Sequence, residues 1–107
     1  CHYCVPAHTG IAKNMKVRDD LIEELRNDET LSDIKLNTLK ETVLAVTRGR
    51  GNIDGAQLDA FYSAGYKHKQ LLEIILILAQ KVMSNYTNHV ADTPVDEPFK
   101  KFDWSPK

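Results

Sequence analysis

The most constraining feature of the sequence is the recurrence of apolar residues at helical spacing. Leu36, Leu39, Val43 and Val46 follow one another at intervals of three, four and three residues, which places them on one helix face. No segment alternates apolar and polar residues between turn-forming residues, as a half-buried strand would. The sequence therefore predicts an all-α fold, built as an orthogonal or bundle-like array of helices.

Capping and turn-forming residues divide this pattern into five predicted helices. They cover residues 4–15, 20–26, a third stretch from Ser32 or Asp33 to Gly49, a fourth from Asp54 to Gly65, and 69–90. Asp54 followed by Gln57 resembles a capping box, in which each side chain bonds the other residue's backbone N–H. The run from Ile74 to Ala79 is apolar on every face, so we expect the last helix to be the buried centre of the fold.

The C-terminal tail is expected to dock on another surface rather than to move freely. After Pro94, three aromatic residues (Phe99, Phe102 and Trp104) occur in an otherwise largely polar segment, which favours docking over free movement. Gly10 lies inside the first predicted helix, where glycine costs roughly 1 kcal/mol relative to alanine. A glycine at that position suggests close packing there.

The length and net charge of the chain limit the classes of protein to which it can belong. Its 107 residues fit one domain, which we assign to residues 1–107. A formal net charge of −1 argues against a broad surface for nucleic acid or for an anionic membrane. The longest apolar run is far shorter than the ~18 residues that span a bilayer. The chain carries no secretory signal, and because it begins with cysteine rather than methionine, we expect a fragment or a processed product in which something precedes Cys1.

The two cysteines, Cys1 and Cys4, lie three residues apart, and the rest of the chain has none. A secreted disulfide scaffold uses more cysteines, spread along the chain so that they close long loops. A close pair in an otherwise cysteine-free chain is typical of redox or metal chemistry in a reducing compartment. This usage predicts a cytoplasmic protein.

Cys1, Cys4 and His8 form the predicted catalytic site. On a helix these three positions fall within a ~60° stripe. Cysteines at i and i+3 can form a disulfide with little movement, and a helix N-terminus lowers a thiol pKa by stabilising the thiolate. His8, one turn later, can accept the thiol proton or return it. We therefore expect a thiol centre that reduces peroxides or exchanges disulfides.

Two other interpretations of this motif stay open. A structural zinc site needs four ligands, and the motif supplies three, because His2 points about 100° away and His89 is remote in sequence. The cysteines can also be buried and inert beside a core histidine.

Asn85 and His89, at i and i+4, could line the thiol pocket, or they could serve a helix cap or an oligomer contact.

The segments CHYCVPAH and TGIAKNM resemble the C-x-x-C-x-x-x-H motif of the carboxymuconolactone decarboxylase and alkyl hydroperoxidase D-like family. Two later segments, TRGRGNIDGAQLDAFYSAGYKHKQLLEII and SNYTNHVADTPVDEPFKKFDW, resemble its peroxidase-related branch. The resemblance implies an all-helical homo-oligomer with thiol-dependent peroxidase activity and neither haem nor metal. It also implies that the chain is the C-terminal portion of the family domain. The expected partners are a hydroperoxide substrate and a thiol or dithiol reductant.

The resemblance also divides the work among the motif residues. It implies that Cys4 is the peroxidatic thiol, that Cys1 resolves it and meets the reductant, and that His8 relays protons. Hydroperoxidase members carry a histidine directly before the second cysteine, where this chain has Tyr3. They also carry a glutamate upstream of the first cysteine, at a position before this chain begins. Two alternatives remain: a lyase of the decarboxylase branch, which does not depend on a cysteine pair, and a non-enzymatic redox-responsive oligomeric module.

Overall fold

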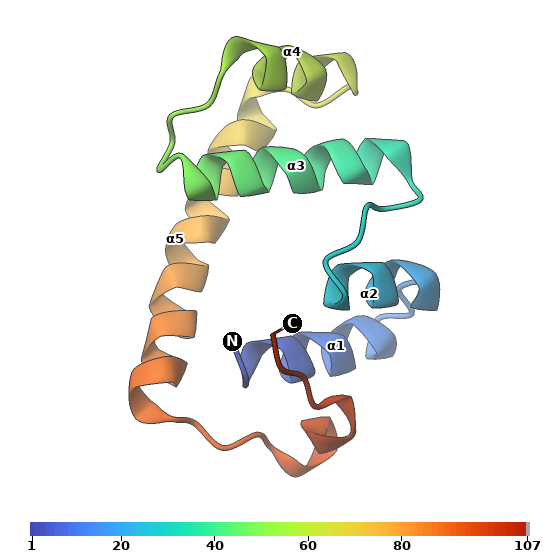
Figure 1. Cartoon of the computed structure of the whole chain (residues 1–107), viewed down its shortest axis with the longest axis vertical. Coiled ribbons are helices and arrows are strands. Elements are labelled where there is room, and N and C mark those ends of the chain that lie inside the picture. The colour runs from blue at the N-terminus through green and yellow to red at the C-terminus, as the bar shows by residue number, and fades with distance from the viewer. Residues whose placement is uncertain (107) are drawn as a thin grey trace. The chain divides into compact units, whose positions relative to one another are not determined.

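A computed structural model describes residues 1–106, and every regular element among them is helical. Figure 1 shows these elements in chain order. The helices are α1 (Cys4–Asn14), α2 (Asp19–Arg26), α3 (Ile34–Arg48), α4 (Gly55–Ser63), α5 (His68–Ala91) and the 3-10 helix η1 (Glu97–Phe102). The all-α prediction is confirmed, and the five predicted helices lie close to their expected bounds. The additional short helix, η1, lies in the tail.

Capping residues explain where α3 and α4 begin. Asp33, rather than Ser32, caps α3, because its carboxylate accepts the N–H of Leu36 at 2.9 Å. Asp54 caps α4 in the same way, accepting the N–H of Gln57 at 2.8 Å. Of the two hydrogen bonds in the predicted capping box, the one from the Gln57 N–H to the Asp54 carboxylate is the one that forms. The Gln57 side chain donates instead to the hydroxyl of Thr42 at 2.9 Å and thereby joins α4 to α3.

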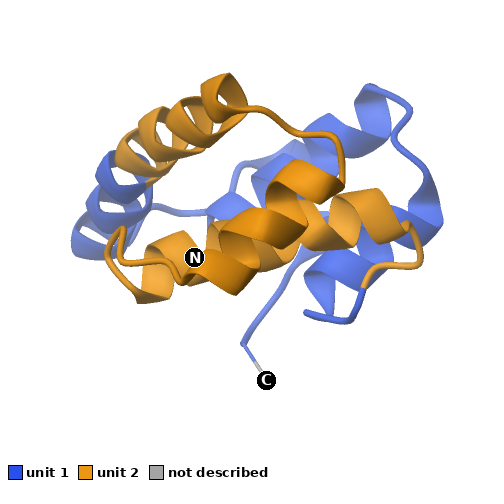
Figure 2. Ribbon diagram, turned by 90° about the horizontal axis from the view of Figure 1, so that it is seen from above, with its two compact units in different colours: residues 1–30, 82–107 blue, residues 31–81 orange. Residues whose placement is uncertain are grey.

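The described residues fall into two compact units, which are coloured separately in Figure 2. One unit contains residues 1–30 and the chain from Val82 onward, and the other contains residues 31–81. Helix α5 contributes its residues 68–81 to the second unit and 82–91 to the first. Within the described residues, none of the helices has both the length and the apolar character to cross a membrane.

The second unit is built around Phe61 of α4, which is completely buried. The Phe61 ring stacks on the ring of Tyr66, with centroids 4.9 Å apart and planes 13° from parallel. Tyr66 in turn donates its hydroxyl proton to the carbonyl oxygen of Lys35 on α3. Gly65, at φ +101°, stops α4 and turns the chain toward α5. Because Gly65 has no Cβ, it adopts this left-handed conformation without strain.

In the first unit the tail packs against α1 and α2, so the prediction that it docks is confirmed, and the structure identifies the two helices. A Cβ added to Gly10 of α1 would lie 2.6 Å from Cδ1 of Phe99 and 3.3 Å from Cε2 of Phe102, so the glycine allows both rings to approach. The indole N–H of Trp104 donates to the carbonyl oxygen of Arg26 at the end of α2, at 2.9 Å. The three tail aromatics therefore dock on the helices.

The prediction that the last helix is the buried centre of the fold is wrong for this chain alone. Within the second unit, Ile74 is 7% exposed, but Leu76 is 71% and Ile77 is 53% exposed. A helix that is apolar all round needs neighbours on every side to be fully covered. The short helices of one chain cover only the face that carries Ile74.

Candidate functional site

Cys1 and Cys4 form a disulfide at the start of α1. Cys4 is the first residue of the helix, whereas Cys1 lies in the turn before it, so the predicted stripe begins one turn too early. The Cys1 sulfur accepts the backbone N–H of Cys4 at 3.1 Å. Cys1 Sγ therefore serves one of the N–H groups that a helix leaves unpaired at its N-terminus. The same N-terminus favours negative charge on that sulfur when the disulfide is reduced.

The two cysteines differ in accessibility. Cys4 is 8% exposed, while Cys1 is only half-buried. Pro6 and Ala7 are also buried, so the first turn of α1 packs against the rest of the unit. Proline is tolerated at this position because the first turn of a helix has no partner for its N–H groups. Of the two residues in the disulfide, Cys1 is thus the one that an outside thiol reaches more easily.

His8 lies one turn after Cys4 on α1 and is exposed. Its ring nitrogen Nδ1 lies 2.7 Å from the carbonyl oxygen of Cys4. Because a carbonyl oxygen only accepts hydrogen bonds, Nδ1 carries the proton, and in the neutral ring Nε2 is the basic nitrogen. The predicted histidine is therefore anchored, through the main chain, to the cysteine that it was expected to serve.

A residue from the far end of the sequence also reaches the disulfide. The side-chain amide of Asn88 on α5 lies 3.6 Å from Cys4 Sγ and donates toward it. From the sequence, Asn85 and His89 were the residues of this segment expected to line the thiol pocket, and Asn88 was not predicted to do so. Asn88 lies three residues after Asn85 and thus on the same side of the helix. The three-residue spacing from Asn85 was therefore the sequence signal that could have identified Asn88.

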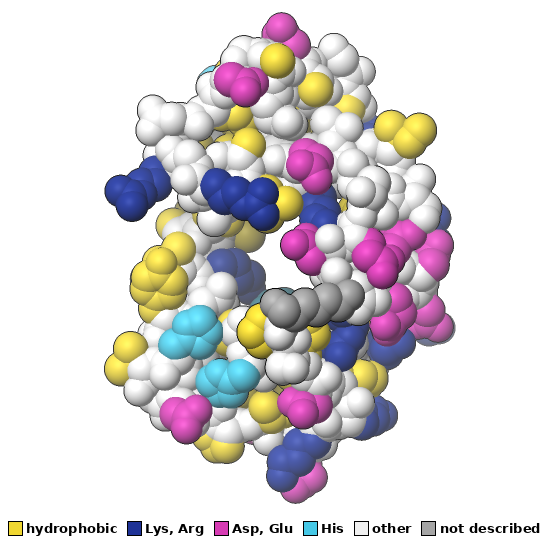
Figure 3. Space-filling model, in the orientation of Figure 1, with side chains coloured by type: hydrophobic (Ala, Val, Ile, Leu, Met, Phe, Trp, Pro, Cys, Tyr) yellow, Lys and Arg dark blue, Asp and Glu magenta, His cyan; other side chains and the backbone are white. Residues whose placement is uncertain are grey.

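Two histidines pack together beside the motif. The rings of His2 and His89 stack with centroids 6.2 Å apart and planes 25° from parallel. His2 Nε2 donates to the carbonyl oxygen of Thr93 at 2.9 Å and lies 3.7 Å from a carboxylate oxygen of Asp92. Figure 3 shows a neighbouring pair of histidine side chains at the surface. Within residues 1–106, no group of three or more His, Cys, Asp or Glu side chains is placed to hold a metal ion.

Tyr3 directly precedes Cys4, at the position where the resemblance implies a histidine. Its hydroxyl donates to a carboxylate oxygen of Asp96 at 2.7 Å. This hydrogen bond, together with partial burial and the negative charge of Asp96, raises the pKa of Tyr3 above its ordinary value. The phenol therefore stays protonated at neutral pH and cannot act as a base in place of a histidine.

These contacts define what the site can do chemically. Two sulfurs lie within bonding distance, one buried and one accessible, and a histidine with a defined basic nitrogen is held one turn away. Such an arrangement can pass between a dithiol and a disulfide while protons enter and leave. No protein-family model matches the chain, and no curated protein matches it significantly.

Proposed function

We propose that this chain is a thiol-dependent peroxidase of the carboxymuconolactone decarboxylase and alkyl hydroperoxidase D-like family. The observation that carries the proposal is the bond between Cys1 and Cys4 at the N-terminus of α1. A peroxidase of this type must bring a second sulfur to the oxidised one, and the spacing of the pair achieves this within a single turn. We place the reaction in a reducing compartment such as the cytoplasm, where a disulfide cycle can be recharged.

In the proposed reaction, the Cys4 thiolate attacks the terminal oxygen of a hydroperoxide. The O–O bond breaks, Cys4 becomes a sulfenic acid, and the leaving alkoxide takes a proton to become an alcohol. The Cys1 thiolate then attacks Cys4 Sγ, forming the disulfide and releasing hydroxide, which is protonated to water. An external dithiol reduces the disulfide by attack on a sulfur and is itself oxidised. The peroxide is reduced overall at the expense of the dithiol.

The roles of the individual residues follow from accessibility and hydrogen bonding. Cys1 is the more exposed cysteine, which supports its role as the sulfur that meets the reductant. The protonated ring of His8 can supply the proton that the leaving alkoxide needs, and its neutral ring can accept the thiol proton through Nε2. The Nδ1 bond to the Cys4 carbonyl holds the ring in one tautomer during both transfers.

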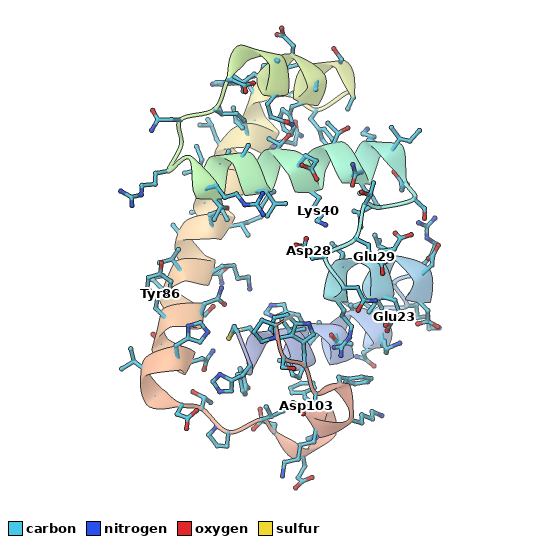
Figure 4. All side chains as sticks on the ribbon, in the orientation of Figure 1. Glu23, Asp28, Glu29, Lys40, Tyr86 and Asp103 are labelled. Atoms are coloured by element: carbon cyan, nitrogen blue, oxygen red, sulfur yellow. A yellow bond between two sulfur atoms is a disulfide. The ribbon has the colours of Figure 1, made fainter. Side chains whose placement is uncertain are left out.

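The proposed enzyme is a homo-oligomer, and the distribution of side chains on α5 supports this. In the first unit, residues 84, 85 and 88, which are all polar, are half-buried. The opposite side carries Val82, Met83, Tyr86 and Val90, which are between 46% and 89% exposed. Figure 4 shows Tyr86 projecting from α5 on the side away from α1. A helix whose apolar side faces outward is expected to bury that side against another chain, here a second copy.

The test is peroxide consumption in the presence of a dithiol reductant. Wild type should turn over repeatedly, and Cys4→Ser should consume none above background. Cys1→Ser should consume about one equivalent, because its sulfenic acid has no resolving thiol. His8→Ala should lose about 10²-fold in rate through loss of the proton relay. His68→Ala, which changes an exposed histidine of the other unit, should match wild type.

An alternative from another class is a redox-responsive module without turnover. The specific observation in its favour is that the residues between the two cysteines contact the tail. His2 bonds the Thr93 carbonyl oxygen, and Tyr3 bonds Asp96. Opening the disulfide can therefore loosen these contacts. A wild-type protein that forms its disulfide readily with peroxide but gives no second turnover with the dithiol would favour this module over the peroxidase.

A further inference from the structure

The contact between Asn88 and Cys4 joins two residues that are 84 positions apart in sequence. Asn88 is half-buried on α5, and Cys4 is buried at the start of α1. The other sulfur of the pair has its own donor, because Cys1 Sγ accepts the backbone N–H of Cys4. Each sulfur of the disulfide is thus paired with a separate N–H group, one from the main chain and one from a side chain.

The strength of such a contact depends on the redox state of the sulfur. A disulfide or thiol sulfur is a weak acceptor, so the 3.6 Å contact contributes little in the oxidised protein. A thiolate carries a full negative charge, and hydrogen bonds to charged groups are about twice as strong as neutral ones. A donor that is already aimed at the sulfur needs no reorganisation when the charge develops. Such a donor therefore stabilises the reduced, deprotonated sulfur more than it stabilises the disulfide or the neutral thiol.

We propose that Asn88 is a catalytic residue of the thiol site, whose side-chain amide stabilises the Cys4 thiolate as the attacking nucleophile. This inference rests on the proposed peroxidase function and adds a residue from α5 to the motif of α1. The amide is neutral, so it stabilises the charge without competing for the proton. It also makes the chemistry depend on α5, because the donor reaches the sulfur only when that helix is in place.

The ionisable groups around Cys4 come from each neighbouring segment. His8 is on α1 itself and His2 is in the preceding turn. His89 is on α5, and Asp92 directly follows the end of that helix. All four are present in each variant described below. Their contributions to the Cys4 thiol pKa are therefore common to every measurement and cancel in the comparison.

The first measurement is a thiolate titration by ultraviolet absorbance, in a Cys1→Ser background that leaves Cys4 as the single thiol. Asn88→Ala should raise the Cys4 thiol pKa by about 0.5 to 1 unit, a roughly three- to tenfold loss of thiolate at a fixed pH below the pKa. Asn88→Asp keeps the shape but replaces the amide with a carboxylate, so it should raise the pKa further. Thr87→Ala, one position earlier on the exposed side of α5, should leave it unchanged.

The second measurement is the equilibrium of the two-cysteine protein with a reference dithiol across pH. Below the Cys4 thiol pKa, Asn88→Ala and wild type should have the same equilibrium, because the neutral thiol gains little from the amide. Above that pKa they should separate by the same three- to tenfold factor, with the variant favouring the disulfide. A residue that only supports the fold would shift the equilibrium without this pH dependence.

An unchanged Cys4 thiol pKa in both Asn88 variants, or an equal shift in Thr87→Ala, would overturn the assignment. Circular dichroism identifies any variant that does not fold, and Asn88→Asp keeps the test decisive if Asn88→Ala is unfolded. Neither measurement uses peroxide. If wild type consumes no peroxide but the pKa shifts as expected, the peroxidase proposal fails and the role of Asn88 as a thiolate donor stands. If wild type consumes peroxide but the Cys4 thiol pKa does not change in the Asn88 variants, the peroxidase proposal stands and the role of Asn88 as a thiolate donor fails.

Discussion

The hydroxyl of Tyr3 donates a hydrogen bond to a carboxylate oxygen of Asp96 at 2.7 Å. This bond joins the turn between the two cysteines to the residue that directly precedes η1. The disulfide and the tail are therefore connected through a side chain whose ionisation can be followed. Tyr3 has a pKa raised first by this hydrogen bond, then by partial burial and by the charge of Asp96.

Tyr3→Phe should lower stability at neutral pH, with a difference from wild type that depends on pH. The folded-state pKa of Tyr3 lies above its ordinary value of 10.0, so the contribution of this bond is fully present below pH 10.0. It is lost as the pH rises through the raised pKa, because the phenolate and the Asp96 carboxylate then repel each other. Urea unfolding of both proteins across this range measures the effect. A difference that stays constant from neutral to strongly alkaline pH would contradict the assignment.

Gly10→Ala should destabilise the protein although alanine is the better helix former. The added Cβ would lie 2.6 Å from Phe99, so the ring must shift. Overpacking of this kind typically costs about 1–3 kcal/mol, which exceeds the roughly 1 kcal/mol that alanine gains in a helix. The matched control is Gly55→Ala at the start of α4, where an added Cβ meets nothing within 4 Å. Thermal unfolding should show a loss at Gly10 and none at Gly55.

Arg26→Met should loosen the tail. The Arg26 guanidinium donates to the hydroxyl of Thr9 and to the carbonyl oxygens of Phe102 and Asp103, at 2.8 to 3.0 Å. Figure 4 labels Asp103 where the tail returns to the helices. Leaving these acceptors without their donor should cost about 1–3 kcal/mol.

The single tryptophan of the chain, Trp104, reports on the same contact because its indole bonds the Arg26 carbonyl oxygen. Its fluorescence should shift toward that of an exposed indole in Arg26→Met. Arg18→Met is the control, since Arg18 is exposed and pairs with the exposed carboxylate of Asp20 at 3.3 Å. An Arg26 variant that matches Arg18→Met in stability and in fluorescence would exclude this role for Arg26.

Tyr86→Glu and Met83→Glu should dissociate the proposed homo-oligomer. These side chains are 64% and 67% exposed in one chain, and a charge on an interface that excludes water is strongly unfavourable. Sedimentation velocity should detect a smaller species than wild type. Gln80→Glu, at an exposed polar position of α5, should not change the assembly state. A wild type that sediments as a monomer at all concentrations would rule out the proposal.

Features that depend on near neighbours in the chain were predictable from the residues alone. The caps at Asp33 and Asp54, the stop at Gly65 and the spacing of the cysteines all involve groups within three or four residues of one another. Where a side chain had a choice between a local and a distant partner, the prediction failed. Gln57 faces the hydroxyl of Thr42 on α3 instead of completing its own cap.

The sequence by itself determined the helical class, the approximate helix limits and the closeness of Cys1, Cys4 and His8 at the start of α1. These follow from backbone hydrogen bonding and from the 3.6-residue period, which act over one or two turns. Only the tertiary structure decided that Asn88 reaches Cys4 and that the apolar run of α5 is largely exposed. Both depend on how segments far apart in sequence pack, and a pattern read along one helix does not specify the neighbour that will cover each face.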